Sequence, residues 1–260
     1  MGLIEQLKST GFSFNKRLGQ NFIADEGFLQ SVVAELNLGK SDTVVEVGTG
    51  AGTLTRTLAR VAGRVVTYEI DKRLEPVLHF DENVELVFAD VLKAKMPDTP
   101  FTVVANIPYY ITTPLIMKFL NDPNCVRICV LVQADVARRI VAKPGTKDYG
   151  ALSVGCQAQA ECKILKLVPR GLFIPQPSVD SAFVAMSLRA QRSNPYLEKL
   201  LKTIFSARRK TILNALSNLV SKEKAREILA KAGIAETVRP EQIPPEKFVE
   251  LARLLFDKKP

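Results

Sequence analysis

The length, composition and charge of the chain exclude several classes of protein. Its 260 residues, 47% hydrophobic and 24% charged, suit a globular protein with a substantial core, and without a long apolar run or a signal pattern we expect a cytoplasmic protein with no membrane span. The four cysteines form no CxxC pair and a single histidine could join them, so we expect no metal site; the net charge of +9 favours an anionic partner.

Short apolar runs alternate with helical patterns between residues 43 and 142. Continuous apolar runs are typical of strands buried on both faces of a parallel sheet. The runs cover residues 43–47, 64–70, 84–89, 101–106 and 125–133, and the helical patterns cover about 52–62, 72–80, 112–120 and 134–142. A last strand at 181–189 closes this domain, which we assign to residues 1–190. The rhythm predicts an α/β fold with a mostly parallel, doubly wound sheet, whose ligands bind at the carboxyl ends of the strands.

The first strand leads into a glycine-rich loop, Glu46-Val47-Gly48-Thr49-Gly50-Ala51-Gly52. Glycines let a backbone turn tightly and approach a ligand closely. A dinucleotide site would have the pattern GxGxxG, but here the third glycine comes one residue early, and Thr53 occupies the sixth place. The loop instead resembles motif I of Rossmann-like methyltransferases, which holds the methionine part of S-adenosylmethionine.

The next two strands each end in an acidic residue. Glu69 can accept hydrogen bonds from both hydroxyls of a ribose, and Asp90 can accept one from an adenine amine. Either acid alone is as well explained by a solvated strand end or a helix cap. Two of them at successive strand ends behind a glycine loop favour an adenosine-containing cofactor.

The fourth strand ends in Asn106-Ile107-Pro108-Tyr109-Tyr110. An adenine N6 amine is a poor nucleophile because its lone pair is delocalised into the ring. The Asn106 side-chain oxygen and the Ile107 carbonyl could bind the amine hydrogens and direct the lone pair at a sulfonium methyl group. Pro108 would fix the backbone, and Tyr109 would offer a face for stacking of an extruded base.

The C-terminal part of the chain is basic and helical. Residues 189–260 contain 16 Lys or Arg and 8 Asp or Glu, against 20 and 19 in residues 1–188. Helical periodicity near 195–206, 208–219, 222–232 and 245–257 predicts a small all-α domain, which we assign to residues 191–260. Its surplus charge favours nucleic-acid binding, with a merely solvated basic bundle as the alternative.

Six segments, taken in order, resemble the motifs of the ribosomal RNA adenine dimethyltransferase family. They are KRLGQNF (16–22), EVGTGAGTLT (46–55), NIPYYIT (106–112), GTKDYGALS (145–153), FIPQPSVDSAF (173–183) and RRKTILNAL (208–216). The resemblance implies a monomeric enzyme that uses S-adenosylmethionine to dimethylate N6 of two adjacent adenosines near the 3′ end of small-subunit rRNA. It further implies that the substrate is rRNA in an assembling 30S-type particle and that the enzyme takes part in small-subunit biogenesis.

The resemblance also implies roles for individual residues. The catalytic group would be Asn106, Ile107, Pro108, Tyr109 and Phe173, with Phe173 facing Tyr109 across the extruded base. The cofactor would be held by the N-terminal segment, the glycine loop and the strand ends, at Gln20, Asn21, Ile23, Gly48, Gly50, Glu69, Ile70, Asp90, Val91 and Asn106. Phosphates of RNA would be bound by Lys16, Arg17, Arg208, Arg209 and Lys210.

The sequence departs from the family pattern in places, and three other functions stay open. Thr49 replaces a proline that is common in the family, Tyr110 often appears there as asparagine, and Asp135 stands where glutamate is usual. The alternatives are a large-subunit rRNA adenine methyltransferase of the macrolide-resistance type, a non-catalytic RNA-binding factor on the same fold, and a DNA adenine methyltransferase. The segments YGALSV and RRKTILNAL favour the small-subunit enzyme.

Overall fold

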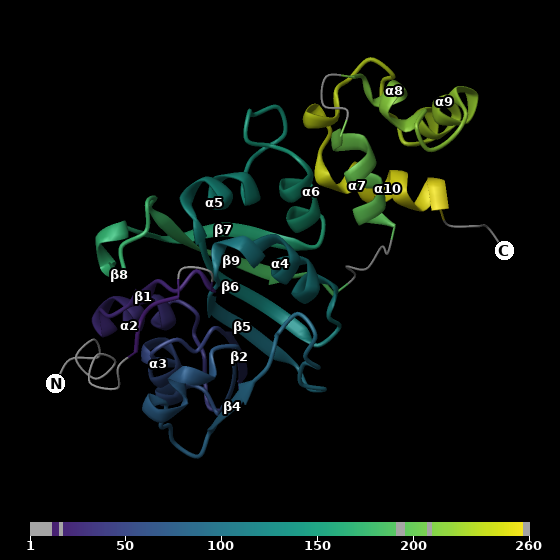
Figure 1. Cartoon of the computed structure of the whole chain (residues 1–260). Coiled ribbons are helices and arrows are strands. Elements are labelled where there is room, and N and C mark those ends of the chain that lie inside the picture. Colours follow the sequence, from purple (N-terminus) through teal and green to yellow (C-terminus); the bar gives the residue numbers. More distant parts are fainter. Residues whose placement is uncertain (1–11, 16–17, 191–195, 207–209, 257–260) are drawn as a thin grey trace. The chain divides into compact units, whose positions relative to one another are not determined.

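The chain folds into two compact units (Figure 1). The computed structural model describes residues 12–15, 18–190, 196–206 and 210–256. The first unit comprises the described residues up to Ala137 together with Lys163–Leu188. The second comprises Arg138–Cys162 and the described residues from Arg189 onward, so it includes a segment that the sequence analysis assigns to the first domain.

A seven-stranded sheet carries the cavity that is described below, and its strand order is β4-β3-β2-β5-β6-β9-β7. The neighbours from β4 to β6 are parallel, and β6 and β9 are antiparallel. A separate antiparallel pair joins β1 to β8. The strands are β1 (Phe22–Ile23), β2 (Thr43–Val47), β3 (Arg64–Glu69), β4 (Val84–Phe88), β5 (Phe101–Asn106), β6 (Cys125–Gln133), β7 (Ala160–Val168), β8 (Phe173–Ile174) and β9 (Ser181–Leu188).

Helices cover both faces of the sheet, as the doubly wound prediction requires. On one face, α2 (Glu26–Ala34) and α3 (Thr53–Val61) share a buried apolar cluster with alternate strand residues such as Val104. On the other face, α4 (Thr112–Asn121) packs Phe119 edge-on against Phe101, with ring centroids 6.4 Å apart, within the range that aromatic pairs prefer. Successive residues of a strand face opposite sides of the sheet, so these contacts place helices on both of its faces. The predicted α/β fold class is confirmed.

The second unit has a helical core of its own. Its helices are α6 (Ala151–Gln157), α7 (Leu197–Ser206), α8 (Ile212–Leu216), α9 (Lys222–Lys231) and α10 (Pro245–Phe256), with a 3₁₀ turn at Pro240–Gln242. Tyr149 is fully buried in this core and donates a hydrogen bond of 2.8 Å to the Ile243 carbonyl. This contact between residues distant in sequence explains why the segment before α6 belongs to the second unit.

The remaining elements depart from the sequence expectations in places. The predicted helix at 72–80 is a 3₁₀ helix, Lys72–Val77, because Pro76 lies inside it and cannot donate a backbone hydrogen bond. β7 is not among the predicted strands, and most of its side chains are exposed or partly buried. Further elements are α5 (Ala134–Ile140) and 3₁₀ turns at Tyr109–Ile111 and Arg170–Leu172.

Candidate active site

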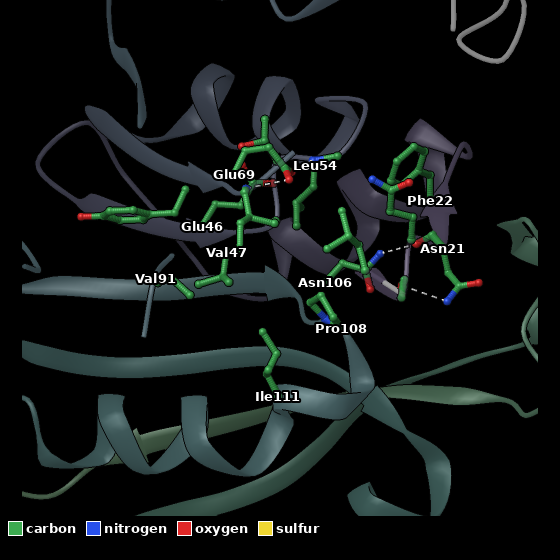
Figure 2. A pocket seen from close by; sticks show the side chains of 18 of the residues that line it. Asn21, Phe22, Glu46, Val47, Leu54, Glu69, Val91, Asn106, Pro108 and Ile111 are labelled. Atoms are coloured by element: carbon green, nitrogen blue, oxygen red, sulfur yellow. Dashed lines mark hydrogen bonds between the residues drawn. The ribbon is translucent and has the colours of Figure 1, made fainter. Parts of the chain in front are cut away.

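A cavity of about 260 Å³ opens at the carboxyl ends of β2, β3, β4 and β5 (Figure 2). This is the edge of a parallel sheet at which α/β proteins bind their ligands. The lining includes each of the ten residues expected to bind the cofactor. They are Gln20, Asn21, Ile23, Gly48, Gly50, Glu69, Ile70, Asp90, Val91 and Asn106.

The glycine-rich loop after β2 needs its glycines for conformation and for space. Gly48, Gly50 and Gly52 all have positive φ angles, of +78°, +55° and +78°, a backbone region that other residues rarely adopt. A side-chain carbon at Gly50 would lie 3.0 Å from the Phe22 ring. The loop therefore leaves its backbone open to a ligand on one side while it packs tightly against Phe22 on the other.

Glu69 at the end of β3 joins the loop to the next strand. Its Oε2 accepts a hydrogen bond from the Gly50 N–H, and its Oε1 accepts bonds from the N–H groups of Ile70 and Asp71, all at 2.8–2.9 Å. A carboxylate offers about four acceptor positions, so these bonds leave Oε2 with capacity for a ligand hydroxyl. Burial raises the pKa of Glu69, and the three backbone hydrogen bonds oppose that rise.

The acidic residues in the lining favour a cationic ligand. Glu46, Glu69 and Asp90 all line the cavity, whereas its described lining contains no lysine, arginine or histidine. Asp90 is half-buried, and its Oδ1 accepts a hydrogen bond of 3.0 Å from the Leu92 N–H, which fixes the turn after β4. A nucleotide phosphate would be repelled here, while a sulfonium and an ammonium group would be attracted.

The side chain of Asn106 is held in a single orientation. Its amide nitrogen donates a hydrogen bond of 2.8 Å to the backbone carbonyl of Asn21, shown as a dashed line in Figure 2. A carbonyl oxygen can only accept, so the amide nitrogen must face Asn21, and the Asn106 Oδ1 is left to accept hydrogen bonds from a substrate. The next residue, Ile107, is buried, so its backbone carbonyl is the group it can offer to a substrate amine.

The two expected stacking residues are not part of the cavity lining. Tyr109 is half-buried, its hydroxyl pairs with the Ser181 hydroxyl at 2.8 Å, and burial raises its pKa. Phe173 is 2% exposed and packs in the apolar cluster beneath the sheet, where β8 pairs with β1. Tyr110, which the sequence analysis does not assign to the site, lines the cavity and is 60% exposed.

Hydrogen bonds of Gln20, which lines the cavity, connect the N-terminal segment to the rest of the first unit. The Gln20 side chain accepts a hydrogen bond from the Asn15 N–H and donates one to Asp71, each 2.8 Å long. Asp71 also holds Arg73 in a bidentate pair, which lowers the pKa of Asp71. The amide of Gln20 therefore has protein partners at both of its ends, and it connects the N-terminal segment to Asp71.

Most of the expected RNA-binding residues lie outside the described part of the chain. Lys16, Arg17, Arg208 and Arg209 are among these, whereas Lys210 is exposed just before α8. Among the described residues, no group of His, Cys, Asp and Glu side chains could hold a metal ion. None of the described helices has the length and hydrophobicity needed to cross a membrane.

The fold and the cavity together define a class of enzyme. A mostly parallel sheet with helices on both faces, a glycine loop after its first parallel strand and acids at the next two strand ends make this a Rossmann-like, S-adenosylmethionine-dependent methyltransferase. The cofactor fits the site because acidic groups and an open glycine backbone line the same cavity. The chain belongs to the ribosomal RNA adenine dimethylase family, whose model matches residues 11–257.

Similar proteins cover nearly the whole chain. A protein of Clostridioides difficile named ribosomal RNA small subunit methyltransferase A is 40% identical over 98% of this chain and 95% of its own length. A protein of the same name from Enterococcus faecalis is 41% identical over the same shares.

Two solved structures are similar to this chain over most of its length. The crystal structure of a dimethyladenosine transferase from Plasmodium falciparum has a TM-score of 0.78 and 25% identity, covering 87% of this chain and 94% of that one. The structure of the 23S rRNA methyltransferase ErmE has a TM-score of 0.67 and 29% identity, covering 91% and 100%.

Proposed function

We propose that this enzyme dimethylates N6 of two adjacent adenosines near the 3′ end of small-subunit rRNA. The observation that supports this most directly is the fixed orientation of Asn106, whose free oxygen lies at the rim of an acidic cavity. The relatives named small subunit methyltransferase A support the choice of rRNA. The substrate would be rRNA in an assembling 30S-type particle, bound by a monomer that also serves small-subunit biogenesis.

The residues of the chain position the target amine for attack. S-adenosylmethionine supplies an electrophilic methyl group when bound. The Asn106 Oδ1 and the Ile107 carbonyl would each accept one hydrogen of the N6 amine, so that the nitrogen lone pair is directed at the methyl carbon. Transfer would leave S-adenosylhomocysteine and a methylated, positively charged amine, which then releases one proton to solvent water. No strong base is needed because the sulfonium is already activated.

Glu69 and Asp90 would hold the adenosine part of the cofactor. The remaining acceptor capacity of Glu69 Oε2 suits a ribose hydroxyl, and Asp90 suits the adenine amine. Pro108 would keep the Ile107 carbonyl directed at the substrate, and Tyr109 and Phe173 would stack on the extruded base. Because Phe173 is buried, stacking requires that the β1–β8 pair and its surroundings change on RNA binding.

Transfer of a labelled methyl group to four substrates tests this function. The substrates are small subunits that lack the modification, naked small-subunit rRNA, large-subunit rRNA and duplex DNA, with modified bases mapped by primer extension. We expect label on two adjacent adenosines near the 3′ end of small-subunit rRNA. Label confined to large-subunit rRNA or to DNA would overturn the proposal, and label on none of the four would indicate a non-catalytic RNA-binding protein.

A further inference from the structure

Glu46 is an ionisable group in the cavity wall that the methyl transfer described above does not use. It lies in β2 just before the glycine loop, lines the cavity and is 0% exposed. Its Oε2 accepts hydrogen bonds from the hydroxyls of Thr55 at 2.6 Å and Thr67 at 2.7 Å. Its Oε1 is buried without a hydrogen-bond partner. An ionised carboxylate with an unpaired buried oxygen is costly, whereas a neutral carboxyl group tolerates this environment better.

The hydrogen bonds around Glu46 are compatible with both protonation states. The Thr67 hydroxyl also lies 2.7 Å from the Thr49 hydroxyl, and either of these two groups can be the donor. When Glu46 is ionised, Thr49 donates to Thr67, which donates to Glu46. When Glu46 carries the proton on Oε2, Glu46 donates to Thr67, which donates to Thr49. No heavy atom needs to move between the two arrangements.

This chain of hydroxyls ends in the glycine loop. Thr49 is buried in the loop and lines the cavity. The groups that contact Glu46 are the hydroxyls of Thr55 from α3 and Thr67 from β3, and Thr49 of the loop reaches it through Thr67. The charged group that acts on Glu46 is Glu69 of β3. The neighbouring strand β5 contributes residues such as Val103 and Val104, which do not titrate.

We propose that Glu46 senses the charge of the bound cofactor, releasing its proton when cationic S-adenosylmethionine binds and keeping it when the neutral product S-adenosylhomocysteine binds. The proton passes to the buffer, and the carboxylate that remains is stabilised by the sulfonium charge in the same cavity. Replacement of S-adenosylmethionine by S-adenosylhomocysteine in the cavity is thereby coupled to the uptake of a proton by Glu46. Burial, which raises the pKa of Glu46 to about 8, supports a protonated group in the free enzyme at neutral pH.

The coupling predicts how cofactor affinity depends on pH. A cation in the cavity lowers the pKa of Glu46, so the affinity for S-adenosylmethionine rises with pH, by up to about tenfold per unit between roughly pH 6 and 8. The affinity for S-adenosylhomocysteine changes much less over this range. Cofactor binding can be measured without RNA, so a failure of this proton coupling leaves the rRNA proposal untouched.

Calorimetry counts the released protons. Heats of binding at pH 7 are measured in two buffers of different ionisation enthalpy, with wild type, Glu46→Gln and, as a control, Glu85→Gln, which makes the same change at an exposed position of β4. For S-adenosylmethionine we expect release of about 0.5–0.9 proton from wild type and from the control, and a clearly smaller release from Glu46→Gln. Each ligand carries an amine that can also titrate, but the difference between the proteins removes its contribution.

The wild-type protein alone provides a second test should Glu46→Gln fail to fold. The two ligands share their amine and carboxylate and differ in the charge of the sulfur. We expect wild type to release at least about half a proton more with S-adenosylmethionine than with S-adenosylhomocysteine at pH 7. Equal release with both ligands, or undiminished release from a folded Glu46→Gln, would overturn the proposal.

Discussion

Asn106 is the residue on which the proposed chemistry depends. We expect Asn106→Ala to lower the rate of methyl transfer by about a hundredfold or more, because the amine loses one of the two acceptors that orient it. RNA affinity should stay within about twofold of wild type, measured by filter binding. Asn121→Ala, at an exposed position at the end of α4, is the matched control and should change neither quantity. Loss of RNA affinity together with activity would mean that Asn106 has a structural role.

The buried carboxyl group of Glu46 also makes the stability of the free enzyme depend on pH. Its pKa in the folded protein, about 8, exceeds the ordinary value of 4.5, so the folded state binds the proton more tightly than the unfolded state. The free energy of unfolding should therefore fall as pH rises from about 4.5 to about 8, by at most about 1.4 kcal/mol per unit from this group.

Urea unfolding at pH 5, 7 and 9 measures this dependence. Relative to wild type, Glu46→Gln should gain stability as pH rises, because glutamine cannot ionise. Unfolding curves of the two proteins that shift in parallel with pH would show that Glu46 does not titrate in this range.

At the scale of single elements, the role of the glycine loop can be tested by comparing an alanine substitution inside the loop with one outside it. We expect Gly50→Ala to destabilise the enzyme by about 1–2 kcal/mol and to weaken binding of S-adenosylmethionine, because Gly50 has a φ of +55° and faces Phe22. Gly171→Ala should change little, since nothing lies within 4 Å of an added carbon there. Thermal unfolding and calorimetric titration check both effects. Equal melting temperatures for the two variants would contradict the role given to the loop.

The sequence predicts the elements whose pattern is local. Apolar runs such as 101–106 identify the parallel strands, and the residues that end them identify the cofactor side of the sheet. β7 escapes prediction because the strands are predicted from continuous apolar runs, whereas Glu161, Lys163 and Lys166 interrupt the apolar residues of β7. The helix expected at 72–80 is a shorter 3₁₀ helix, Lys72–Val77, because Pro76 cannot donate a backbone hydrogen bond.

Within the site, sequence identifies residues but not their orientation. Tyr109 and Tyr110 are adjacent in one turn, and only the structure shows that Tyr110 lines the cavity. Glu46 appears in the sequence as part of a motif, but its pKa depends first on its burial, which raises it, and then on the hydroxyls of Thr55 and Thr67, which lower it and come from other elements. The stacking roles of Tyr109 and Phe173 stay predictions.

At the scale of the whole molecule, the second unit owes its boundary to contacts that are distant in sequence. Tyr149 and Ile243 meet in its core, which no local pattern indicates. The charge distribution, in contrast, is a property of the sequence alone, and it favours RNA binding by the basic C-terminal part.

The salt dependence of RNA binding tests this use of the basic residues. We expect replacement of Arg208, Arg209 and Lys210 by glutamine to reduce the slope of log affinity against log salt by about 2–3, because each phosphate contact contributes roughly 0.7–0.9. Affinity for S-adenosylmethionine should be unchanged by the triple replacement. An unaltered slope would mean that these side chains do not contact phosphates.

The most direct test of the account is a crystal structure of the enzyme with S-adenosylhomocysteine. We expect the methionine part of the ligand against Gly48 and Gly50, a ribose hydroxyl at Glu69, and the sulfur directed toward Asn106. Density for the ligand elsewhere, or a sulfur atom turned away from Asn106, would contradict the central claim that this cavity brings a methyl donor to an adenine amine.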